Sequence, residues 1–269
     1  MRSDLVPDDL WERAAPLLPP IPERRRRYPG RLRVADRTTL AGVLYVLRTG
    51  VAWRDVPAET VGCSGVTAWR RLRDWTEAGV WPRLHAALLT ELRQAELLEL
   101  DDRAVDGSRV RGLKRGDCVG PSPVDRARLG SKHHVVVDRY GTPLAVTLTG
   151  GNRHDVTQLL PPLDAIPPIR GRRGRPRRKP RRLYADRGYD FDKYRRLLWK
   201  RGIKPVIARR GVPHGSGLGK VRWVVERVFA WLHQFKRLRV RYERRADIHR
   251  GLLTLACSII FLRKLRFAE

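Results

Sequence analysis

The sequence is poor in cysteine, in methionine and in acidic residues. It has three Cys and one Met in 269 residues, and 28 Asp and Glu stand against 57 Lys and Arg. The three cysteines, Cys63, Cys118 and Cys257, lack the spacing of metal ligands. Their odd number in a chain of this length argues against a disulfide framework and is typical of reduced thiols.

Long apolar runs are also missing. The most apolar stretch, residues 251–262, is 12 residues long, and a helix needs roughly 20 to cross a bilayer. It predicts a buried helix. Residues 1–4 contain no apolar core of a signal peptide. We therefore expect a cytoplasmic, nucleoid-associated protein with no membrane partner.

What the sequence has in excess is positive charge. The formal net charge is +29, and a surface of this kind favours a polyanionic partner, with double-stranded DNA as the expected one. Only nine of the 57 basic residues are Lys, so 48 are Arg. A GC-rich genome could produce such a bias, and a merely basic protein is the alternative.

Residues 1–97 are predicted to be helical. Asp8 and Asp9 begin one helix, Asp36 precedes an apolar run that stops at Gly50, and Ser64 begins a third helix. That third helix has Val66, Trp69, Leu72 and Trp75 on one side and Arg70, Arg71 and Arg73 on the other. Short helices joined by tight turns, one with an Arg-rich face, indicate a DNA-binding domain of helix-turn-helix type. A helical bundle with solvated arginines is the alternative.

Residues 98–269 have the pattern of a second, α/β domain. Short apolar runs predict strands that form a mixed sheet flanked by helices. A capping-box spacing at residues 155–158 predicts a helix that continues to Ile166. The predicted strands are 102–106, 133–138, 143–149, 183–186 and 203–208, and the later helices are 191–200, the one that bears Glu226, and 247–264. The basic loop 169–182 lacks a core of its own, since nine of the thirteen residues 170–182 are Lys or Arg.

Three acidic residues occupy positions that suit a metal ion. Asp106 and Asp186 each follow a short apolar strand and precede a glycine, and Glu226 lies on a strongly amphipathic helix. If the strands are neighbours, the carboxylates can share a site, and their mutual repulsion then requires a cation. Oxygen ligands without His or Cys favour Mg²⁺ or Mn²⁺. Taken singly, each Asp also suits a turn or a helix cap.

On the Glu226 helix, one apolar stripe is bordered by polar side chains. Val221, Val224, Val225, Val228 and Leu232 form the stripe. Arg222, Glu226 and His233 are separated by four and seven residues, so they project within about 40° of one another. An ion pair between Arg222 and Glu226 on a solvated face is the alternative reading of this spacing.

A series of motifs covers nearly the whole chain in order. It comprises Leu10-Trp11, Gly50-Val51-Ala52-Trp53-Arg54-Asp55-Val56-Pro57, Val105-Asp106-Gly107-Ser108, Gly130-Ser131-Lys132-His133-His134, Gly151-Asn152-Arg153-His154-Asp155, Tyr184-Ala185-Asp186-Arg187-Gly188-Tyr189 and Arg222-Trp223-Val224-Val225-Glu226-Arg227. With these motifs the chain resembles the bacterial insertion-sequence transposases of the DDE class, in the IS-five branch of the IS-four superfamily.

The resemblance implies a ribonuclease-H-like catalytic fold with Asp106, Asp186 and Glu226 as catalytic and metal-binding triad. Two Mg²⁺ or Mn²⁺ ions are implied, together with cutting and strand transfer of DNA at the inverted-repeat ends of an element. The superfamily signature Tyr-x2-Arg-x3-Glu-x6-Lys is matched by Arg222 and Glu226, whereas Gly219 replaces the Tyr and His233 replaces the Lys. Neutral imidazole attracts phosphate less than ammonium does.

We expect a homo-oligomer to assemble on the DNA. Basic side chains spread along the chain are expected to contact the DNA: Arg70, Arg71, Arg73, Lys132, Arg175, Arg177, Arg178, Arg222 and His233. Two other functions fit the same sequence: a nuclease of the same fold without strand transfer, and a DNA-binding regulator with an inactive catalytic domain. The presence of all three acids weighs against the regulator.

Overall fold

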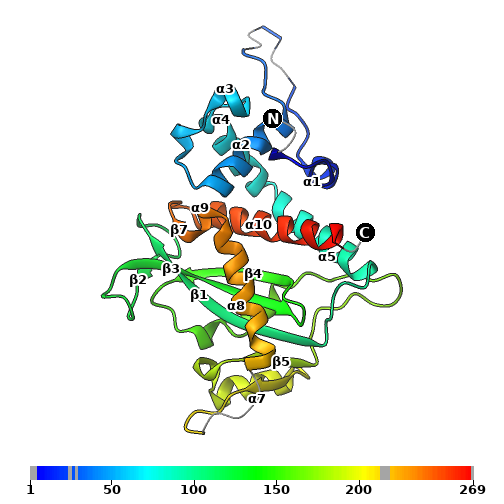
Figure 1. Cartoon of the computed structure of the whole chain (residues 1–269), viewed down its shortest axis with the longest axis vertical. Coiled ribbons are helices and arrows are strands. Elements are labelled where there is room, and N and C mark those ends of the chain that lie inside the picture. The colour runs from blue at the N-terminus through cyan, green and yellow to red at the C-terminus, as the bar shows by residue number, and fades with distance from the viewer. Residues whose placement is uncertain (1–4, 24–25, 28–29, 213–218, 268–269) are drawn as a thin grey trace.

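A computed structural model of the chain describes residues 5–23, 26–27, 30–212 and 219–267, without the side chains of residues 219–222. Helices gather at one end of the molecule and a mixed sheet at the other, with the long C-terminal helix between them (Figure 1). The expected α/β architecture, a mixed sheet preceded by a helical region, is confirmed.

The helical region follows the predicted order. Its elements are α1 (Asp8–Ala14), η2 (Ala15–Leu17), α2 (Asp36–Thr49), η3 (Trp53–Asp55), α3 (Ala58–Val61), α4 (Gly65–Glu77) and α5 (Val80–Gln94). The Ser64 hydroxyl caps α4 by accepting a hydrogen bond from the Thr67 N–H. Gly50 ends α2 in the left-handed region with φ 76°. Leu72 and Trp75 are fully buried as expected, but Val66 is 53% exposed, so the apolar face of α4 is narrower than predicted.

The sheet has a central path in the order β4-β3-β1-β5-β6. β1 (Asp102–Gly112) pairs antiparallel with β3 (Leu129–Asp138), and β3 pairs antiparallel with β4 (Pro143–Gly150). β1 pairs parallel with β5 (Arg182–Ala185), and β5 with β6 (Lys204–Ile207). The short strands β2 (Gly120–Pro121) and β7 (Val240–Arg241) pair with β3 and β1. Three antiparallel strands followed by two parallel ones in this order are the topology of ribonuclease-H-like folds.

Three predicted boundaries are wrong. β3 begins at Leu129, four residues before the predicted start at His133, because residues 130–132 pair with β1. β1 was expected to end at Asp106 but continues to Gly112. It does so because β3 pairs with it as far as Arg111. The helix expected from Asp155 to Ile166 is instead a 3-10 turn, η4 (Asp155–Gln158), followed by α6 (Pro161–Asp164). Pro161 and Pro162 lack the N–H groups that an uninterrupted α-helix needs at these positions.

The remaining helices cover the sheet and join it to the helical region. They are η5 (Arg187–Tyr189), α7 (Asp192–Lys200), α8 (Gly219–Gln234), α9 (Lys236–Arg239) and α10 (Ala246–Arg266). α10 is buried throughout residues 251–262, as the apolar run predicts, and it packs against α4, α5 and β4. Among the helices that the structure describes, none has the length and apolarity to cross a bilayer.

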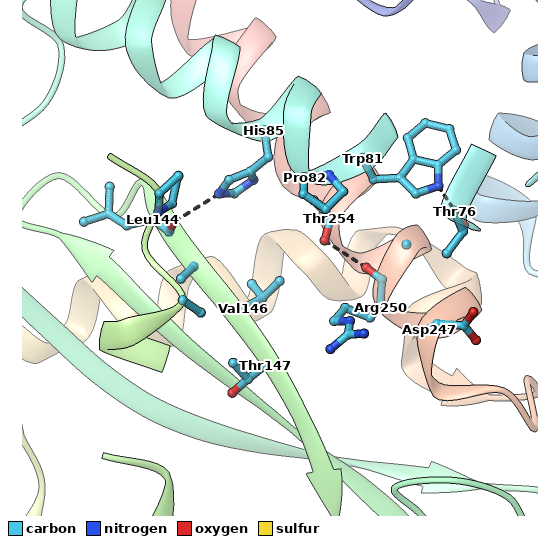
Figure 2. Close-up of a pocket in the computed structure, with 14 residues that line it drawn as sticks. Thr76, Trp81, Pro82, His85, Leu144, Val146, Thr147, Asp247, Arg250 and Thr254 are labelled. Atoms are coloured by element: carbon cyan, nitrogen blue, oxygen red, sulfur yellow. Dashed lines mark hydrogen bonds between the residues drawn. The ribbon is translucent and has the colours of Figure 1, made fainter. Parts of the chain in front are cut away.

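A cavity of about 350 Å³ lies where α5, β4 and α10 meet (Figure 2). At its edge, His85 Nε2–H of α5 donates to the Leu144 carbonyl of β4 at 3.0 Å. Burial lowers the pKa of His85 to about 4, so the ring is neutral at pH 7 and has the tautomer that this bond requires. The bond ties the helical region to the edge strand of the sheet.

Candidate active site

Asp106 lies in the middle of β1, the strand that joins the antiparallel and parallel parts of the sheet. Its register partner on β3 is Val135, and its side chain is half-buried. The carboxylate Oδ1 accepts a hydrogen bond from the Gly107 N–H at 2.7 Å. Because side chains alternate along a strand, Asp106 lies on the face that also carries Ala104, and Gly107 lies on the other face.

Asp186 follows the last residue of β5, the parallel neighbour of β1. Ala104 pairs with Tyr184, so Asp106 and Asp186 each lie two residues beyond the same register position. Asp186 keeps an extended backbone, with φ −80° and ψ −179°. Neighbouring strands are about 4.8 Å apart, and residues two apart share a face. The sheet therefore brings these two aspartates to adjacent positions on one face.

Asp186 also begins the next element. Its Oδ1 accepts a hydrogen bond from the Gly188 N–H at 2.8 Å and so caps η5. A helix-cap role was the alternative interpretation of Asp186. The residue has this role and also lies beside β1. A Cβ added to Gly188 would lie 2.9 Å from that Oδ1, so glycine is needed there for the close approach.

α8, the helix with Glu226, crosses the sheet in contact with β1, β3 and β5 (Figure 1). Val224, Val225, Val228 and Leu232 are buried, as the stripe predicts. The side chains of Val221 and Arg222 lie outside the described residues, and so does the ion pair of Arg222 with Glu226 that was the alternative interpretation of their spacing. Glu226 is exposed at the border of the stripe.

The side of α8 that carries Glu226 also carries His233. His233 follows Glu226 by seven residues on this side. The pKa of the buried His133 lies well below its ordinary value, first because of burial and then because of the charges of His249 and His233. His133 pairs with Ser108 of β1 and contacts His249 of α10 at 2.8 Å, so it shares the face of Asp106. Glu226 therefore lies two helical turns from His233, in the direction of β5.

The two aspartate carboxylates each have a hydrogen bond to the backbone that follows them. In the part of the chain that the structure describes, no three His, Cys, Asp or Glu side chains are arranged to hold a metal ion. Asp106 and Asp186 each direct one oxygen to a nearby backbone N–H. The fold thus brings the backbone positions of the two aspartates together.

Comparisons with known proteins place the chain in a protein family. A family model described as the transposase DDE domain matches residues 99–261, more than half of the chain. The chain belongs to the DDE transposases. A second family model, for proposed transposases of the IS4/5 family, matches residues 6–85 of this transposase.

Two similar proteins come from Burkholderia cepacia. The proposed transposase for insertion sequence element IS402 is 65% identical over 150 residues, which cover 56% of this chain and 71% of that protein. An uncharacterized 16.2 kDa protein of IS402 is 51% identical over 124 residues, 46% of this chain and 84% of that protein. Among solved structures, the Mos1 strand transfer complex aligns over 91% of this chain and 81% of that chain, with 12% identity and a TM-score of 0.32.

Lys132, an expected DNA contact, lies on the sheet face opposite Asp106. Its Nζ donates to both carboxylate oxygens of Asp155, at 3.0 and 3.1 Å, and to the Arg153 carbonyl at 2.9 Å. A Cβ on Gly107 would lie 3.2 Å from Asp155 Oδ1, which places this pair beside Gly107. Asp155 is thereby an ion-pair partner of Lys132, and the neighbouring His154 packs edge-on against Phe191.

The three arginines of α4 differ in their exposure and in their ion pairs with carboxylates. Arg70 is exposed, whereas Arg71 lies 3.5 Å from Asp36 and 3.7 Å from Asp74. Arg73 pairs with Asp74 at 2.7 Å and lies over the ring of Trp69. Of the three, Arg70 offers the most exposed guanidinium for a phosphate.

The basic loop 169–182 is held at its base and exposed beyond it. Ile169 and Arg177 form an antiparallel bridge, and the Arg177 side chain pairs with Asp101. Arg175 and Arg178 are exposed.

His233 of α8, another expected DNA contact, is half-buried. Burial lowers the pKa of His233, so it is a neutral imidazole at pH 7.

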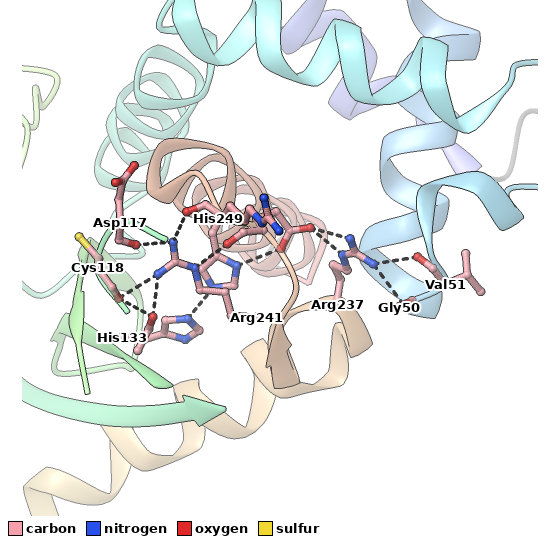
Figure 3. Close-up of polar contacts among 11 residues, drawn as sticks. Gly50, Val51, Asp117, Cys118, His133, Arg237, Arg241 and His249 are labelled. Carbon is pink, nitrogen blue, oxygen red and sulfur yellow. Dashed lines mark hydrogen bonds and ion pairs between the residues drawn. The ribbon is translucent and has the colours of Figure 1, made fainter. Parts of the chain in front are cut away.

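A buried polar network was missed by the sequence reasoning (Figure 3). Arg237 donates to Glu243 Oε1 at 2.7 and 2.8 Å and to the carbonyls of Gly50 and Val51. His249 Nδ1 lies 3.4 Å from Glu243 Oε2. Burial alone would raise the pKa of Glu243, but the hydrogen bond with His249 and the charge of Arg237 lower it to about 2. The network joins the end of α2 to the sheet.

Proposed function

We propose that this transposase cuts DNA at the ends of its element and joins the freed 3′ ends to target DNA, with Asp106, Asp186 and Glu226 as the metal-binding carboxylates. The observation that carries the proposal is the register of β1 and β5, in which the two aspartates follow the paired residues Ala104 and Tyr184 by the same two positions. α8, which crosses both strands, supplies the third acid.

The donor set fits a hard divalent cation. The histidines nearest to Asp106 along the sheet are engaged elsewhere: His133 contacts His249 at 2.8 Å, and His134 Nε2 contacts the Thr149 hydroxyl at 2.8 Å. The remaining donors are carboxylate oxygens, which favour Mg²⁺ or Mn²⁺. When bound, two such ions stabilise the attacking and the leaving oxygens of a phosphodiester exchange.

The protein residues have distinct parts in the proposal. Asp106 on the central strand and Asp186 at the strand end fix the two metal positions relative to the sheet, and Glu226 approaches from the helix above them. Arg222 is proposed to grip a phosphate or to orient Glu226. His233, neutral at pH 7 by the lowered pKa, can accept or donate one hydrogen bond to a phosphate but adds no charge.

DNA binding is proposed to be divided between two parts of the chain. Residues 1–97 form the DNA-binding domain, with the exposed Arg70 of α4 at the duplex, and residues 98–269 form the catalytic domain. Arg175 and Arg178 of the basic loop supply backbone contacts that weaken as salt is raised. Arg71, Arg73, Arg177 and Lys132 are bound to carboxylates, so each contributes to DNA binding only if that ion pair opens. We propose that the protein acts as a homo-oligomer on the two element ends.

Strand transfer is tested separately from cutting. A duplex that carries the terminal inverted repeat found beside the gene, with a pre-cut 3′-hydroxyl, is incubated with the transposase, Mg²⁺ and a supercoiled plasmid. We expect the labelled end to become covalently joined to the plasmid, and no joining with a 3′-dideoxy end. Cleavage of an uncut end in a parallel reaction, with no joined product from the pre-cut end, would show a nuclease instead.

A further inference from the structure

A groove lies at the junction of the helical region and the sheet, and none of the DNA contacts described above uses it. This junction groove has a volume of about 530 Å³. One wall comes from η3 and α4, and the other from the segment after β1 and the segment between β7 and α10. Its main lining residues are Trp53, Arg54, Trp69, Lys114, Tyr242 and Arg244.

The groove is positively charged. The Arg54 side chain is 88% exposed, and its ion pair with the neighbouring Asp55 is 3.5 Å long and also exposed. Lys114 and Arg244 are exposed on the opposite wall. The one acid in the lining, Glu243, is buried and already bound to Arg237 at 2.7 Å. The cations at the mouth therefore outnumber the available carboxylates.

Aromatic rings separate these cations. The guanidinium of Arg237 lies 5.6 Å from the centre of the Trp53 ring and 4.5 Å from that of Tyr242. Trp69 stands beside them on α4, with the guanidinium of Arg73 5.7 Å from its ring centre. Rigid ring faces between cations suit a ligand in which charged phosphates alternate with apolar sugars.

The sheet-side wall is held rigidly (Figure 3). The buried Arg241 donates to the carbonyls of Asp117 at 2.5 Å, Cys118 at 2.9 Å and Arg244 at 3.0 Å. A Cβ on Gly116 would lie 2.3 Å from the Arg244 carbonyl oxygen, so the two segments touch and only glycine fits. The backbone near Lys114 and at Arg244 is thus held in place before any ligand arrives, which lowers the cost of binding.

We propose that the junction groove binds the phosphate backbone of the duplex at the element's end, at a fixed distance from the bond that is cut. The groove is continuous with α4, whose Trp69 lines it and whose Arg70 is exposed one residue later. A DNA duplex that contacts Arg70 can therefore continue into the groove. An isolated small anion would not contact both walls of the groove and the rings between them.

The length of β1 sets that distance. From Asp106 to Gly112, near Lys114, the strand advances six residues at about 3.3 Å each, roughly 20 Å. Duplex DNA advances about 3.4 Å per base pair. In the proposed complex the duplex runs along β1, so the phosphates in the groove lie about six base pairs inside the cleaved bond. This spacing rests on the proposed function, since it takes Asp106 as the position of the cut.

The test uses the full-length protein with Asp106→Asn, so that the DNA stays intact, and a duplex with the terminal inverted repeat found beside the gene. The groove variant carries Lys114→Ala and Arg244→Ala. Its control carries Lys193→Ala and Arg196→Ala, which remove the same two charges from exposed positions of α7, at the other end of the sheet (Figure 1). Both are compared by hydroxyl-radical footprinting and by the salt dependence of the binding constant.

We expect the groove variant to lose protection about six base pairs from the cut and to lower the slope of log K against log salt by about 2, since each phosphate contact contributes about 0.9. The control should keep the protection. Arg54→Ala, on the opposite wall, should weaken protection at the same base pairs. Unchanged protection in the groove variant, or equal losses in both pairs, overturns the proposal. Footprinting requires no cleavage, so a failure of the catalytic proposal would appear separately, as cleavage of the end DNA by the Asp106→Asn protein with the groove footprint intact.

Discussion

Replacing Asp106 or Asp186 by Asn is expected to lower the rate of Mg²⁺-dependent DNA cleavage by about a thousandfold or more. The amide keeps the size of the side chain and can still accept a hydrogen bond from the Gly107 or Gly188 N–H, respectively. It loses the negative charge that holds a divalent cation. The measurement is single-turnover cleavage of a duplex with the element's end, alongside its equilibrium binding.

Binding of the same duplex should change little, because neither aspartate is proposed to contact DNA except through the metal. Asp164→Asn is the matched control, since Asp164 is an exposed carboxylate that pairs with Arg201 at 2.6 Å away from β1 and β5. It should cleave at the normal rate. Full activity of the Asp106 or Asp186 variant would mean that this carboxylate is not part of the catalytic site.

The largest expected effect on stability comes from Glu243→Ala. This change leaves the buried guanidinium of Arg237, 4% exposed, without its carboxylate. A buried charge that loses its partner costs about 3–5 kcal/mol. Because the folded-state pKa of Glu243 is about 2, below its ordinary 4.5, the stabilisation is present above pH 4.5 and is lost as the pH falls toward 2. Urea unfolding at pH 7 measures the loss.

Glu77→Ala is the control for this prediction. Glu77 pairs with Arg245 at 2.9 Å, but its side chain is 53% exposed, so its removal should cost less than about 1 kcal/mol. Replacing both buried partners, with Arg237→Met and Glu243→Leu, should cost less than Glu243→Ala alone because no charge remains unpaired. Equal losses for Glu243→Ala and Glu77→Ala would show that the buried pair contributes no more than a surface pair.

Local patterns predicted the elements whose sequence and environment agree. The helices that became α4 and α8 and the strands β3 and β4 follow from apolar periodicity and short apolar runs. The extension of β1 to Gly112 could not be predicted, because it depends on pairing with a distant strand. The exposure of Val66 likewise depends on which neighbours reach α4.

The aspartates of the candidate site could be predicted from the sequence, whereas the buried network around Arg237 and Arg241 could not. Asp106 and Asp186 each follow a short apolar run, a pattern that is present in the sequence itself. Their equal offset from Ala104 and Tyr184 appears only with the strand register. Arg237 and Arg241 lie in a run of basic residues that resembles a solvated surface. Nothing local marks them as buried, because their burial comes from α2, β3 and α10 packing around them.

The central claim, that these carboxylates hold the catalytic cation directly, is tested most directly by the metal dependence of Asp186→Cys. A thiolate binds Mg²⁺ poorly but accepts softer ions such as Mn²⁺ or Cd²⁺. The account predicts that this variant does not cleave end DNA in Mg²⁺ and regains at least about tenfold activity when a softer ion is added, with no such gain for the unmodified protein. Cleavage by the variant that shows the same preference among metals as the unmodified protein would contradict direct binding by Asp186.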